Sequence, residues 1–383
     1  MPYADDQLIR QAICPTFSTK TAHTGLPPLE ARQRSISRFE FWPSALIYLP
    51  IAVYWIVRGI RHGSLTLPLS ANPGLFLGGL VGEAKSDSFR QAGPYARQHI
   101  APWVAIENKQ NNLAATLEHA TGVMAAKQLS FPLVAKPDVG CRGQGVQIVR
   151  TPEQLHSYLA CFPDAATVLL QELVPWEAEA GVFYIRQPGQ PRGRIFSLTL
   201  KYQPYVFGNG KDTLRTLIER DPRAGQLTHL YFERHRSSLD TVLAHGQPFR
   251  LAFAGSHSRG AIFRSGQHFI TEDLCRTFDA LCDDIKGFYF GRFDVRFKDM
   301  ESFQKGRDFK VLEINGISSE AAHIWDAHSS LRMCYRTLFA QYRELFGVAL
   351  ANRSHGHVSG SLASIVKAWW KERRLTALYP ETE

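Results

Sequence analysis

Apolar and polar residues alternate over short stretches from about residue 64 onward, and this pattern predicts strands separated by helices and turns. Strands are expected at 64–70, 101–107, 131–137, 146–150, 167–174, 181–187, 193–202, 291–297 and 309–314. Helices are expected after Ser86, over 108–129, from Thr151 as N-cap, over 211–220 and over 271–285. Strands and helices interleave without a strict βαβ period and several strands can pair as hairpins, so the pattern predicts the α+β class.

An uncharged apolar segment, residues 41–57, precedes this succession. It contains Pro43 and Pro50, is bracketed by aromatic residues, and is followed by Arg58 and Arg61. A membrane-spanning helix needs about 20 apolar residues, so the segment is at the lower limit of length. Two interpretations stay open: a re-entrant or interfacial segment with Trp and Tyr at headgroup depth, and a buried helical hairpin.

The C-terminal stretch 361–379, SLASIVKAWWKERRLTALY, has helical periodicity. Its apolar face would carry Leu362, Ile365, Val366, Trp369 and Trp370, whereas Lys367, Lys371, Arg373 and Arg374 lie largely elsewhere. A basic amphipathic helix of this kind suits an anionic membrane surface. The alternative is a terminal helix docked on the core.

The composition is that of a globular chain with room for two or three subdomains: 383 residues, 44% hydrophobic and 21% charged. The six cysteines form no C-x-x-C pair, so a zinc or redox motif is not expected and a reducing cytosol is the simpler location. No signal peptide is expected, because polar residues follow Met1. The net charge of +9 and the pI of about 9.3 favour anionic partners, but without a basic-aromatic module or recognition helix no nucleic acid is expected.

A glycine-rich loop in VAKPDVGCRGQGVQIV follows a strand that ends at Lys136. Gly140, Gly143 and Gly145 let the backbone take positive φ and turn successive N–H groups inward, which makes an anion nest. The lysine adds a point charge for a phosphate group. An ordinary hairpin turn is the alternative, and the loop is not a Walker A motif, because no Gly-Lys-Ser/Thr precedes a helix.

Acidic residues stand at the ends of other predicted strands. The backbone of Glu172, Leu173 and Val174 can pair with an adenine edge, and Glu179 can accept hydrogen bonds from ribose hydroxyls. Three further oxygen donors, of the kind that Mg²⁺ prefers, come from RFDVRF and VLEIN, namely Asp294, Glu313 and Asn315.

In these motifs the chain resembles an ATP-grasp enzyme, nearest to the D-alanine–D-alanine ligase branch, over about residues 85–331. The matching positions are Lys85 before IAPWVAIE, Lys136, Glu172, Glu179, the pair Lys201 and Tyr202, Gly291, Arg292, Asp294 and Val295, and Leu312, Glu313 and Asn315. The stretch VFGNGKDTLRTLIE is similar to one in cyanophycin and bacterial glutathione synthetases.

The resemblance implies an ATP-grasp fold in which two α+β subdomains, 85–175 and 176–350, clasp ATP. Residues 1–84 would form an atypical N-terminal region and 351–383 a basic C-terminal helix. The implied reaction passes the γ-phosphoryl group of ATP to a carboxylate, and an amine then attacks the acylphosphate to give an amide, ADP and phosphate. The implied cofactors are ATP and Mg²⁺, with Mn²⁺ as a substitute, and dimers are common among relatives.

The resemblance also implies roles for single residues. Lys85, Lys136, Lys201 and the glycine loop would hold the phosphates, and Asp294, Glu313 and Asn315 the metal. Arg292, with Lys201 and Tyr202, would stand at the reacting groups, with Arg292 where charge builds on the acylphosphate.

The chain departs from the family in two places. Residues 1–84 replace a Rossmann-like domain, and NGISSEAAHIWD replaces the usual N-x-x-P-G loop, so Ser318 and Ser319, with Arg259, are only candidate substrate contacts. Three hypotheses stay open: a ligase for an amphiphilic substrate at the inner face of the membrane, a cytoplasmic ligase for small amino acids, and a kinase-like or regulatory ATP-binding protein without amide-forming activity.

Overall fold

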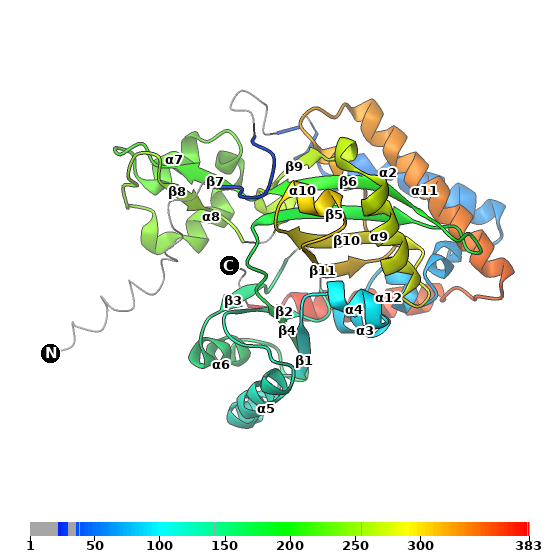
Figure 1. The fold of residues 1–383 in the computed structure, drawn as a ribbon, viewed down its shortest axis with the longest axis horizontal. Coiled ribbons are helices and arrows are strands. Elements are labelled where there is room, and N and C mark those ends of the chain that lie inside the picture. The colour runs from blue at the N-terminus through cyan, green and yellow to red at the C-terminus, as the bar shows by residue number, and fades with distance from the viewer. Residues whose placement is uncertain are drawn as a thin grey trace.

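Three antiparallel sheets carry the strands in the computed structural model, which describes residues 22–29, 36–37, 39–140, 143–253, 255–380 and 382 (Figure 1). The four-stranded sheet has the order β1-β4-β2-β3, with β1 Trp103–Glu107, β4 Thr167–Glu172, β2 Leu133–Pro137 and β3 Gln147–Val149. The five-stranded sheet has the order β11-β10-β5-β6-β9, with β11 Phe309–Asn315, β10 Phe290–Phe297, β5 Ala178–Ile185, β6 Arg194–Tyr202 and β9 Ile262–Ser265. The third sheet pairs β7 Tyr205–Phe207 with β8 Pro248–Arg250.

The α-helices of the described residues are α2 Ser44–Arg61, α3 Lys85–Arg90, α4 Pro94–His99, α5 Leu113–Ala126, α6 Pro152–Ala160, α7 Leu214–Arg220, α8 Thr228–Arg234, α9 Glu272–Asp283, α10 Met300–Gln304, α11 Leu331–Ser354 and α12 Leu362–Thr376. Short 3₁₀ turns connect them: η1 Leu67–Ala71, η2 Phe76–Gly79, η3 Gln110–Asn112, η4 Ala224–Leu227, η5 Arg236–Ser238, η6 His257–Arg259, η7 Gln267–Phe269 and η8 Ala322–Trp325. Helices and antiparallel sheets together confirm the predicted α+β class.

The four-stranded sheet is covered by α5 and α6, as Figure 1 shows. Thr151 caps α6 as predicted, because its side chain accepts a hydrogen bond from the Gln154 N–H. The core between the sheet and these helices includes Val104, Ala120 and Leu155, which are all buried.

The five-stranded sheet has one apolar face and one polar face. On β10, Phe293 and Val295 are fully buried in the core under α9, while Arg292, Asp294 and Arg296 alternate with them on the opposite face. The strand therefore places acids and cations at buried positions without disturbing the apolar core.

The predicted strand at 64–70 is wrong, because this stretch forms the buried 3₁₀ turn η1. Pro68 has no N–H for a strand ladder, and the Ser70 hydroxyl donates to the Leu67 carbonyl within the turn. The turn packs against α11, a helix of 24 residues that the sequence pattern did not predict. The N-terminal region is thus built into the C-terminal half of the chain.

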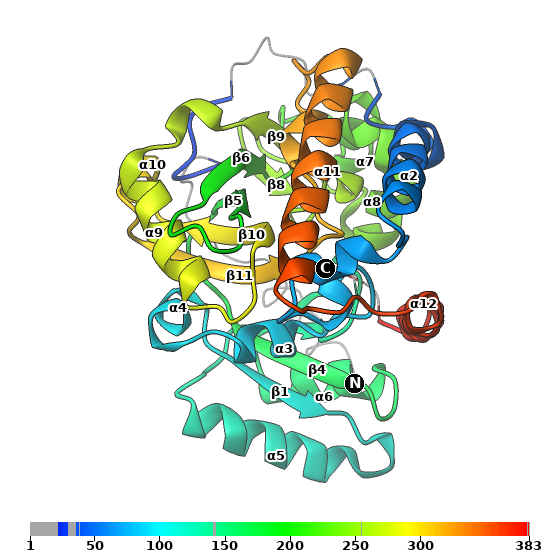
Figure 2. The ribbon, with the colours of Figure 1, turned by 90° about the vertical axis from the view of Figure 1, so that its right-hand side faces the viewer.

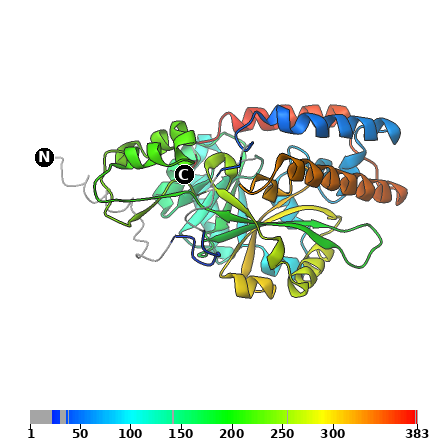
Figure 3. The same ribbon diagram turned by 90° about the horizontal axis from the view of Figure 1, so that it is seen from above.

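Residues 41–57 form neither a buried hairpin nor a re-entrant loop. They contribute to the single helix α2, which carries Pro50 inside it and buries only Ile47, Ile51 and Gly59. By length and composition, α2 is the one helix among the described residues that is able to cross a membrane. Figure 3 shows α2 and α12 along the same edge of the molecule, outside α11.

Candidate active site

Lys136, at the end of β2, joins the two large sheets. Its ammonium group donates to the Oε1 atom of Gln171 at 2.7 Å within its own sheet and to the Leu312 carbonyl of β11 at 2.9 Å. The side chain is buried, and burial lowers the pKa of Lys136 to about 8. A buried cation therefore stands where the four-stranded sheet meets the five-stranded one.

Lys85 reaches the same place from the first residue of α3. Its Nζ atom donates to the Gly140 carbonyl at 2.9 Å and lies 3.5 Å from the Oε1 atom of Glu313 on β11. Asp138 fixes the start of α3, because its carboxylate accepts hydrogen bonds from both the N–H and the hydroxyl of Ser86, each at 2.7 Å. The helix start, the glycine loop and β11 thus meet around one ammonium group.

The glycine loop has the backbone that its sequence requires. Gly140, Gly143 and Gly145 have φ values of 149°, 69° and 72°, a range that side chains other than glycine rarely adopt. Residues 141 and 142 lie outside the described residues, so the geometry of the loop is established at its two sides.

The C-terminal segment lies directly on this loop. The Tyr379 hydroxyl donates to the Val139 carbonyl at 2.6 Å, and the Thr382 hydroxyl accepts from the Gly145 N–H at 3.0 Å and donates to the Gly143 carbonyl at 2.9 Å. A backbone N–H of the proposed anion nest is therefore already bonded to the chain's own C-terminal segment.

A buried network of charges lies on the polar face of the five-stranded sheet. Lys201 of β6 is 2.9 Å from the Asp294 carboxylate of β10 and 3.0 Å from that of Glu179 on β5. Arg292 donates to both oxygens of Asp294, at 2.9 and 3.1 Å. Burial opposes the charged form of Asp294, but Arg292 and Lys201 outweigh it and lower the pKa of Asp294 to about 2. Burial also opposes the charge of Lys201, but Asp294 and Glu179 outweigh it and raise the pKa of Lys201.

The proposed metal ligands are brought together by strand register. Asp294 on β10 faces Glu313 on β11, Asn315 faces Arg292, and the Asn315 amide donates to Asp294 at 3.3 Å. Two carboxylates and one amide oxygen fit the hard-ligand chemistry of Mg²⁺, and the low pKa of Asp294 keeps its carboxylate charged. Within the described part of the chain, no three His, Cys, Asp or Glu side chains cluster as a metal site.

The proposed adenine and ribose positions lie next to this network. The Glu172 N–H donates to the Pro102 carbonyl at 2.8 Å, and the Val174 carbonyl accepts from Arg296 at 3.1 Å, while Leu173 lies between them. Glu179 is only 5% exposed, and Lys201 bonds its carboxylate. The roles of these residues toward a nucleotide stay predictions.

Several predicted site residues lie apart from the charge network. Tyr202 points to the opposite face of β6 from Lys201 and donates to the Pro27 carbonyl at 2.9 Å. The hydroxyl of Ser319 is bonded to the Gly316 carbonyl at 2.6 Å, and Ser318 is exposed on the same turn.

Arg259 lines a different hollow, of about 230 Å³, beside the glycine loop and the C-terminal segment, with Gln144, Leu230, Glu233, Arg234, Tyr379, Pro380 and Thr382. The structure therefore does not bring Arg259 together with Arg292.

Sequence reasoning missed two acidic side chains of the site. Glu83 accepts a hydrogen bond from the Ser88 hydroxyl near Lys85, and burial raises the pKa of Glu83 to about 7. The carboxylate of Glu320 accepts from the Tyr48 hydroxyl of α2 and from the Trp325 indole N–H at 2.6 Å, and its backbone carbonyl accepts from Arg292 at 3.4 Å. Glu83 stands in no motif, whereas Glu320 lies in NGISSEAAHIWD, the stretch that departs from the family pattern and to whose glutamate the sequence reasoning gave no role.

Comparison with known proteins gives matches only among solved structures. No family model matches the chain, and no curated protein does. Of 258 matching chains, a bifunctional glutathione synthetase from Pasteurella multocida is 16% identical with a TM-score of 0.36, and the match covers 67% of this chain and 36% of that one. D-alanine–D-alanine ligase from Bacillus anthracis is 14% identical with a TM-score of 0.38, over 72% of this chain and 67% of that one.

A third match is the ATP-grasp ligase PsnB in complex with a minimal precursor, which is 10% identical with a TM-score of 0.35, over 68% of this chain and 60% of that one. This chain spans about a third of the glutathione synthetase that it matches. These proteins bear the names of the enzymes that the sequence motifs resemble. Because each TM-score is below 0.5, neither the fold nor the reaction is inferred from these matches.

Proposed function

We propose that this chain is an ATP-grasp ligase that joins a carboxylate to an amine with hydrolysis of ATP to ADP and phosphate. One observation carries the proposal: Lys85 of α3 and Lys136 of the four-stranded sheet both reach β11 of the five-stranded sheet beside the glycine loop, and Lys85 lies 3.5 Å from the Glu313 carboxylate there. Lys85 and Lys136 supply the cations, and Glu313 and Asp294 the carboxylates. A triphosphate with its metal needs both kinds of group in one place.

On the nucleotide side, Lys85 and Lys136 lie where they can neutralise phosphate oxygens. Both ammonium groups now donate to backbone carbonyls, Gly140 for Lys85 and Leu312 for Lys136. Carbonyl partners are weaker competitors than carboxylates, so a phosphate group can replace them, and at Lys85 it would also compete with the Glu313 carboxylate at 3.5 Å. Asp294, Glu313 and Asn315 would hold Mg²⁺, which would neutralise the charge of the phosphates when bound.

On the reacting side, an oxygen of the substrate carboxylate attacks the γ-phosphorus atom, and the bond from that phosphorus to the β–γ bridging oxygen breaks to release ADP. The amine nitrogen then attacks the acyl carbon, phosphate leaves, and the amine loses a proton to solvent or to a nearby carboxylate. Arg292 would stabilise the negative charge in both steps, while Asp294 holds its guanidinium through two hydrogen bonds. Lys201 keeps the Asp294 carboxylate in place from the other side.

We also propose that one of the two substrates is amphiphilic and that the enzyme works at the inner face of a membrane. The support is the hydrogen bond from Tyr48 of α2 to Glu320, whose carbonyl is bonded to Arg292. An apolar exposed helix is thus two contacts away from the proposed reacting groups. A ligase for small soluble amino acids would be indifferent to lipid.

Purified protein with Mg²⁺, ATP and hydroxylamine, supplied separately with the soluble and the lipid fraction of a cell extract, tests the reaction. Release of ADP together with a trapped hydroxamate is expected, and the fraction that stimulates it identifies the substrate class. Asp294→Asn is expected to abolish both products. Asp240→Asn, which changes an exposed carboxylate outside the network, is the matched control and is expected to keep both.

Formation of AMP, or of ADP without a trapped acyl group in either fraction, would contradict the ligase proposal. The second outcome would favour a kinase-like or regulatory ATP-binding protein.

A further inference from the structure

Helix α2 presents an apolar face to solvent along its whole length. The outward positions of a surface helix are normally polar, because they contact water. Here the exposed large side chains are Leu46, Leu49, Val53, Ile56, Val57 and Ile60. The opposite side of α2 is also apolar, since Ile47 and Ile51 are buried in the protein core. A helix that is apolar on both sides needs a second partner besides the protein itself.

Helix α12 lies on the same side of the molecule as α2 (Figures 2 and 3). Ala368 anchors α12 to the protein, whereas Leu362, Val366, Trp369 and Trp370 are exposed. Arg373 lies over the Trp369 ring at 5.2 Å. Exposed tryptophans next to cations are typical of segments that lie at the level of lipid headgroups.

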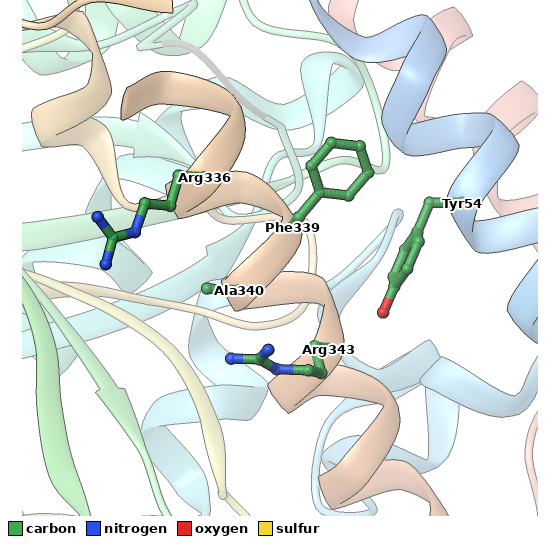
Figure 4. Close-up of a pocket in the computed structure, with 5 residues that line it drawn as sticks. All are labelled: Tyr54, Arg336, Phe339, Ala340 and Arg343. Atoms are coloured by element: carbon green, nitrogen blue, oxygen red, sulfur yellow. The ribbon is translucent and has the colours of Figure 1, made fainter. Parts of the chain in front are cut away.

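Next to the apolar side chains of α2, a groove between α2 and α11 contains two arginines. It has a volume of about 530 Å³ and is lined by Tyr54, Arg336, Phe339, Ala340 and Arg343. Figure 4 shows the Phe339 ring turned toward Tyr54, whereas Arg336 and Arg343 both extend from α11 away from Tyr54. Within the described residues, neither arginine has an acidic partner.

The charge of the chain is concentrated on these three helices. Two basic residues lie on α2, four on α11 and four on α12, against one glutamate on α11 and one on α12. Their net charge is therefore +8, compared with +9 for the whole chain. Both glutamates are bonded internally, Glu344 to Arg194 at 2.9 Å and Glu372 to the Gly82 N–H at 2.7 Å.

We propose that α2, α11 and α12 form a docking surface for an anionic lipid bilayer. The apolar side chains of α2 and α12 would enter the boundary between headgroups and acyl chains, and the basic residues would contact the phosphates of anionic lipids. A second copy of the chain fits less well, because a two-fold contact would set these cations against themselves.

Helix α2 would lie in the plane of the bilayer rather than cross it. Its inner side is held to the protein by Ile47, Ile51 and the Tyr48 hydroxyl bonded to Glu320, and crossing would remove these contacts. Glu320 also bonds Arg292 through its backbone carbonyl, so Arg292 lies close to the docking surface. If the proposed function holds, a substrate at the bilayer surface would reach Arg292 there.

Flotation of the full chain with vesicles, without nucleotide, tests the docking surface. Wild-type protein should float with vesicles of phosphatidylcholine that contain about one third phosphatidylserine, and less with phosphatidylcholine alone. Raising the salt concentration should weaken the binding, because it screens exposed charges. Arg336→Glu with Arg343→Glu should lower the partition coefficient about tenfold or more, and Trp369→Ala with Trp370→Ala should also lower it.

The matched control reverses two exposed cations outside the docking surface, Lys109→Glu with Lys127→Glu, and should float as wild type does. Circular dichroism confirms that each variant is folded. Wild-type protein that stays out of the vesicle fraction, or a control that loses binding equally, would overturn the proposal. The proposal would also be overturned if the wild type forms a dimer that does not bind vesicles and that Val53→Asp dissociates. The apolar face would then contact a second copy of the chain. Because no ATP is present, failure of the ligase proposal leaves this result unaffected.

Discussion

Lys136 and Leu312 belong to different sheets, and the Lys136 ammonium group donates to the Leu312 carbonyl at 2.9 Å. A second bond to β11 comes from the segment just before β1, where the Ala101 N–H donates to the Val311 carbonyl at 3.0 Å. The two walls of the candidate site are thus fixed to each other along β11. A ligand that recruits the Lys136 ammonium group would act on this junction directly.

Lys136→Met should weaken nucleotide binding and change how stability depends on pH. The pKa of Lys136 is lowered to about 8, so between pH 8 and about 10.5 the unfolded chain binds more protons than the folded one. Stability of the wild type should therefore rise relative to the variant in this window, by at most about 1.4 kcal/mol per pH unit. Urea unfolding of both proteins at pH 7.5 and 9.5 measures this difference, and a constant difference would show that the amine is not buried.

The pair Lys201 and Asp294 should behave as one unit. Asp294→Asn removes the carboxylate that pairs with both Lys201 and Arg292. Breaking a buried ion pair in this way lowers the free energy of unfolding by about 3–5 kcal/mol. Lys201→Met with Asp294→Asn should be less destabilised than the two single changes summed, because neither charge is then left unpaired. Urea unfolding of the four proteins gives the coupling energy, and additive effects would contradict the contact.

Acid should remove the contribution of the same pair. The pKa of Asp294 is about 2, below its usual value of 3.8, so its stabilisation is present above pH 3.8 and is lost as the pH falls through 2.

Thr382→Ala should raise the affinity for ATP if the glycine loop binds phosphate. The Thr382 hydroxyl accepts the hydrogen bond of the Gly145 N–H, which an anion nest would offer to a phosphate oxygen. Losing one such competing bond changes affinity by about 1 kcal/mol, or severalfold. Isothermal titration with ATP measures it, with Thr121→Ala on the surface of α5 as the control. A weaker affinity in the Thr382 variant would mean that the C-terminal segment supports the loop instead of competing with the ligand.

The strands of the site were predictable because their signals are local. The sequence of β10 alternates apolar and polar residues from Arg292 to Phe297, which places Asp294 on the polar face. Its pairing with Glu313 was less predictable, because the register shifts between Asp294 and Val295. The glycine loop was also predictable from a local signal, because the positive φ values at 140, 143 and 145 all occur at glycines.

The contacts of α2 and α11 were not predictable, because they depend on the tertiary fold. Tyr48 and Glu320 are 272 residues apart and meet only when α2 packs against α11. The apolar sequence of α2 is compatible with a core, an interface or a membrane, and only its exposure separates these cases. At 64–70 the alternation was misleading, because Pro68 favours a turn over a strand.

Glu83→Gln should remove a destabilisation that appears as the pH rises. The pKa of Glu83 is raised by burial to about 7 from the usual 4.5, so the folded chain binds more protons than the unfolded chain between these values. The wild type should lose stability relative to the variant from pH 5 to pH 7.5, by about 2 kcal/mol in total. Exposed Glu118→Gln on α5 is the control and should show no such trend. Urea unfolding of the three proteins at both pH values is the measurement. A parallel pH response of wild type and Glu83→Gln would show that Glu83 is solvated, and Lys85 would then have a second charged carboxylate beside it at neutral pH, in addition to Glu313.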